Sequence, residues 1–232
     1  FQIVPDVDAA AAALKTGAVD ILPELDTVKI ADLKAAGLKV MAAPGLSWSA
    51  LLIQTDDPLL SNPKLRRAIA HAIDGGQIAA VRTNGLAKAN PSAVAESMRA
   101  FTPAILDWPA YDPQAAGALL KEAGYKGEVI KIQTNRRYVG MYDNAVMMQA
   151  MLSMAGLNVE LEVLDWAAQL DNYVKGAFQL SSFSYSARFD PALMYAAFTA
   201  DKATATWPQR GDTQARAMLN RASHTPAATA RP

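Results

Sequence analysis

The chain has 232 residues, enough for one large domain or two lobes with a buried core. Its 22 Lys and Arg residues balance 22 Asp and Glu residues, so the net charge is zero. No cluster of Lys and Arg is long enough to neutralise a nucleic-acid backbone, and we expect no nucleic-acid partner. Hydrophobic residues make up 51% of the chain, yet no apolar run approaches the ~20 residues that span a bilayer. The absence of cysteine excludes disulfides and thiolate metal sites.

Both ends of the sequence are expected to be cuts within a longer chain. The sequence begins at Phe1 inside a strand-like run, without an initiator Met, a charged n-region or an apolar h-region. It stops at Pro232, shortly after a helix start predicted at Thr225-Pro226.

Strand and helix patterns alternate through the first part of the chain. Strands are predicted over residues 1–4, 18–22, 38–41 and 50–54, and helices over 7–16 and 27–36. Gly17 and Gly37 directly follow the two helices, where glycine supplies the left-handed residue that ends a helix. Asn62 and Pro63 then predict the start of a helix that runs to residue 73.

The second half shows the clearest alternation. A short helix over 76–83 and a Pro- and Ala-rich surface excursion over 86–109 come first. Helices are then predicted over 113–123, 140–155, 166–175 and 191–199, and strands over 129–133, 158–164 and 178–184. Asp112 and Asp165 stand at helix N-cap positions. This order predicts an α/β fold, with a mixed sheet covered by helices on both faces.

Catalytic chemistry has little support in the sequence. His71 lies among apolar helix residues, where a structural role is favoured, and His224 is the only other histidine. No metal-ligand spacing and no phosphate-binding Gly-rich loop occur. We therefore expect no catalytic residues, no metal, no cofactor and no enzymatic activity.

Polar residues that follow two predicted strands are candidate ligand contacts. In open α/β sheets, ligands bind beyond the carboxyl ends of the strands. Arg136 follows the strand over 129–133 and could bind a carboxylate or phosphate, or could belong to a solvated Arg-Arg pair. Asp190 could meet a ligand cation, but its place before Pro191 favours a helix cap. Tyr185 and Arg188 are further candidates, with core packing and a surface charge as their alternatives.

Four ordered motifs resemble one known family. They are ALKTGAVDI over 13–21, PKLRRAIAHAID over 63–74, YDP with LLKEAGY over 111–125, and AGLNV with DW over 155–166. The chain resembles the extracytoplasmic solute-binding proteins of ABC importers, family 5, which include the dipeptide-, oligopeptide- and nickel-binding proteins.

The resemblance implies a fold like that of the type II periplasmic binding proteins. Residues 1–56 would be the C-terminal portion of the first lobe with a hinge strand, and 57–232 a second lobe truncated at its C-terminus. It also implies a monomer in the periplasm, with the signal segment absent from this fragment. Such a protein captures a small peptide-like or anionic solute between its lobes and delivers it to a membrane permease. The alternative on this scaffold is a peptide-binding chaperone or a chemosensory receptor subunit.

The resemblance also implies a set of ligand contacts. An Arg in the loop that contains Asn135, Arg136 and Tyr138 engages the ligand carboxylate in dipeptide-binding members, and Arg136 is the best match. Peptide binders hold the peptide ammonium with an Asp at the position of Ala187. Since Ala187 has no charge and Arg188 is adjacent, we expect a free-amino peptide to be disfavoured. A more anionic solute, such as an opine-like conjugate, a sugar-phosphate or an acidic peptide derivative, is expected instead.

Overall fold

The computed structural model describes residues 2–4, 6–23, 25–43, 45–106, 108–199 and 213–224. The predictions at Phe1 and at Thr225-Pro226 fall outside these ranges. The chain forms two compact units, one of residues 1–44 and 79–88 and one of residues 45–78 and 89–232. The lobe boundary expected near residue 56 concerns a complete two-lobe protein and stays a prediction.

The first unit contains short helices. They are α1 (Val7–Lys15), the 3-10 helix η1 (Thr27–Lys29) and α2 (Ile30–Ala35). The Asp6 carboxylate caps α1 by accepting from the N–H of Ala9 at 2.8 Å, and Lys15 pairs with Asp32. The strands expected over 1–4, 18–22 and 38–41 are wrong for every described residue in them. A strand needs a hydrogen-bonded neighbour, and the described part of this unit supplies none.

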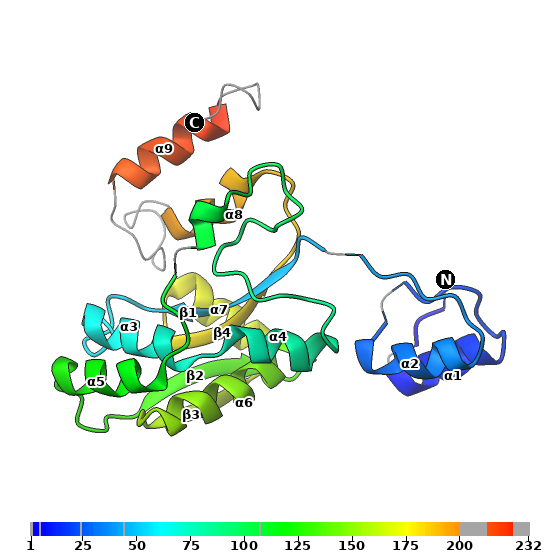
Figure 1. The fold of residues 1–232 in the computed structure, drawn as a ribbon, viewed down its shortest axis with the longest axis horizontal. Coiled ribbons are helices and arrows are strands. Elements are labelled where there is room, and N and C mark those ends of the chain that lie inside the picture. The colour runs from blue at the N-terminus through cyan, green and yellow to red at the C-terminus, as the bar shows by residue number, and fades with distance from the viewer. Residues whose placement is uncertain are drawn as a thin grey trace. The chain divides into compact units, whose positions relative to one another are not determined.

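The second unit is built on a four-stranded mixed sheet (Figure 1). Its strands are β1 (Trp48–Ile53), β2 (Ile130–Asn135), β3 (Val159–Leu164) and β4 (Leu180–Tyr185). They lie in the order β1-β4-β2-β3; β2 runs parallel to β3 and β4, and β1 runs antiparallel to β4. The predicted mixed sheet is confirmed.

One face of the sheet holds the main hydrophobic core. Ile132 and Leu180 are paired on β2 and β4 and are both fully buried in this core. Three helices contribute side chains to this core, namely α3 (Pro63–Ala72), α5 (Pro113–Ala123) and α6 (Val139–Met154). The caps predicted at Asn62 and Asp112 are present, because Asn62 accepts from Lys64 N–H at 3.0 Å and Asp112 from Gln114 N–H at 3.0 Å.

The opposite face is covered by α7 (Trp166–Lys175). Successive residues of a strand point to opposite faces, so Gln133 and Ser181, each next to a core residue, point away from the main core. Gln169 of α7 donates to the hydroxyl of Ser181 at 2.9 Å on this face. Leu52, Phe178 and Phe183 form a second, smaller core beside it. Helices therefore cover both faces, as predicted.

The remaining helices are α4 (Gly75–Thr83), the 3-10 helix η2 (Pro103–Leu106), α8 (Pro191–Thr199) and α9 (Thr213–His224). The segment expected to be a surface excursion over 86–109 is partly anchored, since Ala93 and Val94 are buried. His71 has a structural role, because its Nδ1 lies 2.8 Å from the carbonyl oxygen of Ala110. No helix in the described ranges is long and apolar enough to cross a membrane.

Candidate ligand-binding site

The predicted ligand residues lie at one edge of the sheet. Asn135 ends β2 and Tyr185 ends β4, and these two strands are parallel neighbours. The carboxyl ends of parallel neighbours meet at the same edge, where α/β sheets bind their ligands. Arg136 and Tyr138 follow β2, and Arg188 follows β4.

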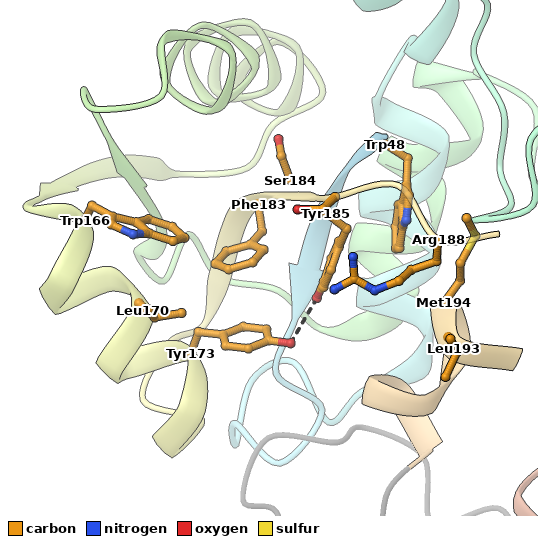
Figure 2. Close-up of a pocket in the computed structure, with 11 residues that line it drawn as sticks. Trp48, Trp166, Leu170, Tyr173, Phe183, Ser184, Tyr185, Arg188, Leu193 and Met194 are labelled. Atoms are coloured by element: carbon orange, nitrogen blue, oxygen red, sulfur yellow. Dashed lines mark hydrogen bonds between the residues drawn. The ribbon is translucent and has the colours of Figure 1, made fainter. Parts of the chain in front are cut away.

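A pocket of about 340 Å³ lies at this edge (Figure 2). Its wall comes from the start of β1, from α7, from the end of β4 with the loop after it, and from α8. The lining residues are mainly aromatic and aliphatic: Trp48, Trp166, Leu170, Tyr173, Phe183, Ser184, Tyr185, Ser186, Arg188, Leu193 and Met194.

Strand pairing and helix periodicity bring the aromatic rings together. Trp48 and Tyr185 are register partners on β1 and β4, and their rings stack at 4.6 Å with an interplanar angle of 16°. Phe183 lies two residues before Tyr185, on the same face of β4. Its ring stacks on that of Tyr173 at 4.5 Å and 11°. Trp166 and Tyr173 are two helical turns apart on α7, so both face the sheet.

A buried amide pair holds α7 against the sheet. Asn135 and Gln169 are both fully buried, and Asn135 Nδ2 donates to Gln169 Oε1 at 2.6 Å. Gln169 Nε2 donates in turn to Ser181 Oγ at 2.9 Å and to Ser182 O at 3.0 Å. The same pair orders the loop after β2, because Asn135 Oδ1 accepts from the N–H of Tyr138 at 2.9 Å.

Among the described residues, the lining of the pocket carries one charge. This charge belongs to Arg188, and no ion pair of Arg188 occurs within the same ranges. Its Nη1 donates to the neighbouring carbonyl oxygen of Ala187 at 3.1 Å. Burial, together with a hydrogen bond to the Tyr173 hydroxyl, raises the pKa of Tyr185 above its ordinary value. The phenol keeps its proton, which it donates to the Tyr173 hydroxyl at 3.4 Å.

The ligand contacts predicted from the sequence lie in different parts of the structure. Tyr185 and Arg188 line the pocket. Tyr138 lies behind the lining, with its ring edge-on to Trp166 at 4.9 Å. The guanidinium of Arg136 lies 4.2 Å from the centre of the Tyr142 ring, and its Nη2 donates to the Tyr142 hydroxyl at 2.9 Å.

Two other candidates have structural partners. The Asn135 side chain is fully buried and hydrogen-bonded within the protein. The Asp190 carboxylate accepts from the N–H of Ala192 at 2.9 Å, which is the helix-capping contact that its sequence position favours. Contact of any of these residues with a ligand stays a prediction.

Sequence reasoning missed most of the pocket wall. Trp48, Trp166, Tyr173 and Phe183 were not among the candidates. Phe183 and Tyr185 alternate on one strand, and Trp166 and Tyr173 are seven residues apart on one helix, so each pair shares a face. That pattern marks an aromatic surface, although it does not show that the two surfaces meet.

Metal binding has no structural support within the described ranges. No three or more His, Cys, Asp or Glu side chains are grouped there so that they could hold an ion.

Residues 1–206 match the model of the bacterial extracellular solute-binding proteins, family 5, middle region. The chain belongs to this family. The family-5 chain is 26% identical over 185 residues to the dipeptide-binding protein of Escherichia coli K12, covering 77% of this chain and 34% of that protein. It is 27% identical over 184 residues to the glutathione-binding protein GsiB of the same strain, covering 78% of this chain and 35% of GsiB.

Solved structures show the same fold. HbpA2 from Haemophilus parasuis matches with a TM-score of 0.81 at 24% identity, over 100% of this family-5 chain and 47% of HbpA2. AgaA from A. tumefaciens R10, solved with agropinic acid, matches with a TM-score of 0.77 at 23% identity, over 97% and 47% of the two chains. The matches span about a third of the curated relatives and about half of these solved chains.

Proposed function

We propose that this family-5 chain is part of the substrate-binding component of an ABC import system. It contributes one wall of a site that captures a small peptide-like or anionic solute, which is then delivered to a membrane permease. The observation that carries the proposal is the aromatic pocket with Arg188, at the sheet edge where α/β proteins bind ligands. The proposal includes a monomeric protein that acts outside the cytoplasm, without catalysis.

The names of the relatives support an organic acid as the solute. They include a dipeptide-binding protein, a glutathione-binding protein and a structure with agropinic acid. Each of these compounds carries a carboxylate. An arginine guanidinium binds a carboxylate through two parallel hydrogen bonds, and Arg188 places one in the pocket wall.

We assign the ligand contacts in two groups. Arg188 and Tyr185 contact the solute directly, since both line the pocket. Tyr138 supports the pocket through Trp166. A carboxylate contact by Arg136 requires its guanidinium to turn away from Tyr142, which it now covers.

Native mass spectrometry of the full-length gene product tests this function. We expect one co-purified small solute per protein molecule, and calorimetry with that solute should show one-to-one binding without turnover. Deletion of the gene should abolish uptake of the same solute by cells. Chemical conversion of the solute by the purified protein, or binding of unfolded proteins in place of a small solute, would contradict the proposal.

A further inference from the structure

The residues that line the pocket favour the binding of an apolar ring. Eight of the eleven described residues that line it are aromatic or aliphatic, and the volume of about 340 Å³ is at the small end of the range for small-molecule sites, about 300–1,000 Å³. Aromatic rings prefer offset or edge-to-face contact with other rings. The rings here come from β1, β4 and α7, so a ligand ring can meet aromatic groups from several directions (Figure 2).

Arg188, the one charged residue in the described part of the lining, favours an anion. The guanidinium of Arg188 has five N–H donors, and within the described residues its one hydrogen bond is the 3.1 Å contact to Ala187 O. The other donors can bind a carboxylate in the fork geometry. The hydroxyls of Tyr173, Tyr185 and Ser186 lie in the same wall and can bind an uncharged amide.

A ligand ammonium has no matching group among the described residues of this pocket. None of those that line it is acidic, and the nearby Asp190 carboxylate caps the chain at Ala192. Aromatic faces attract cations. However, Trp48 and Tyr185 cover one face of each other, as do Tyr173 and Phe183, and a bound ammonium would also be repelled by Arg188.

We propose that the pocket binds a carboxylate-bearing acyl compound with an aromatic ring and no free ammonium, such as an N-arylacyl amino acid. This inference rests on the proposed function, and it names the substrate class of the same site. The ring occupies the aromatic part of the pocket, the amide contacts the hydroxyls, and the carboxylate pairs with Arg188.

Calorimetry of the full-length gene product with four matched probes tests the inference. N-(3-phenylpropanoyl)glycine carries all three features. Phe-Gly adds only the ammonium, N-propanoylglycine lacks only the ring, and N-(3-phenylpropanoyl)glycinamide lacks only the carboxylate. We expect the first probe to bind at least about tenfold more tightly than each of the others. N-propanoylglycine and the glycinamide each lack one contact with the pocket wall, and the ammonium of Phe-Gly is repelled by Arg188.

Two variants and a matched control locate the contacts. Arg188→Gln should weaken binding of N-(3-phenylpropanoyl)glycine about tenfold or more and leave binding of its amide unchanged. Trp166→Leu removes a lining ring without removing a hydroxyl, so it should weaken the two ring probes without the ammonium and leave N-propanoylglycine unchanged. Arg67→Gln removes the same charge from an exposed site on α3, on the other face of the sheet, and should change nothing.

The outcomes separate this inference from the proposed function. Phe-Gly binding as tightly as its des-amino analogue, or no binding of N-(3-phenylpropanoyl)glycine, overturns the inference. If another solute co-purifies and binds in that case, the solute-binding function stands without this substrate class. If no solute binds at all, both fail.

Discussion

The Asn135 amide donates to the Gln169 side chain over 2.6 Å, and neither residue is exposed to solvent. This bond joins the end of β2 to α7, and Gln169 extends it to Ser181 and Ser182 on β4. Trp166 lies on α7 and Tyr185 on β4, and Tyr138 lies in the loop after β2 that Asn135 also binds. Asn135 therefore supports the pocket indirectly, because its bond to Gln169 fixes α7 against the sheet.

Replacement of Gln169 by Leu should therefore destabilise the protein. The substitution leaves the buried Nδ2 of Asn135 without its oxygen acceptor, and Ser181 and Ser182 lose their amide donor. We expect the free energy of unfolding to fall by about 1–3 kcal/mol in urea denaturation. Gln114→Leu, on the exposed first turn of α5, is the control and should change stability by less than about 0.5 kcal/mol.

Two aspartates at helix starts should differ in their effect on stability. Asp112 accepts hydrogen bonds from Gln114 and Ala115, whereas the side chain of Asp165 makes no capping bond. We expect Asp112→Ala to lower the free energy of unfolding by about 1 kcal/mol. Asp165→Ala should lose only its interaction with the helix dipole, about 0.5 kcal/mol. Equal losses in thermal or urea unfolding would refute the difference in capping.

Substitution by alanine should have opposite effects on stability at two glycines, one inside α5 and one at its end. Gly124 ends α5 with φ of 71°, a conformation that costs an L-residue roughly 1–2 kcal/mol. Gly117 lies inside α5, and a Cβ built there meets nothing within 4 Å. Gly124→Ala should therefore destabilise the protein. Gly117→Ala should stabilise it by about 0.5–1 kcal/mol, measured as a shift of the urea midpoint.

Alkaline pH should destabilise the protein through Tyr185. Burial raises the pKa of this phenol in the folded state, so the folded protein holds the proton more tightly than the unfolded chain. The resulting stability is present below the ordinary tyrosine pKa of about 10 and is lost as the pH rises above it. We expect the free energy of unfolding to fall between about pH 9 and about pH 11. The fall should be smaller in Tyr185→Phe. An identical pH profile in both proteins would show that Tyr185 ionises normally in the fold.

Local signals in the sequence predicted the helices of the second unit well. Asn62, Asp112 and Gly124 act on backbone groups within a few residues, so their roles can be inferred without the fold. Asp165 shows the limit of this inference. Its position correctly predicts where α7 begins, but the capping bond depends on a side-chain rotamer that sequence spacing does not specify.

Nonlocal contacts explain what the sequence could not predict. The strands expected over 18–22 and 38–41 have suitable residues, but a strand also requires a partner. The pocket needs the pairing of β1 with β4, which sets Trp48 beside Tyr185. Tyr185 and Arg188 were identified because both follow one strand. Trp48 was missed because it reaches the site from a distant part of the chain.

Trp48 and Trp166 both line the pocket, so their intrinsic fluorescence can report on what occupies it. Indole emission responds to the polarity of its surroundings, and two of the three tryptophans within the described ranges line this pocket. Trp108, by contrast, is 58% exposed and lies outside the lining. A solute that displaces water from the pocket therefore changes the fluorescence of Trp48 and Trp166 without any added label, and this signal allows large compound collections to be screened in solution.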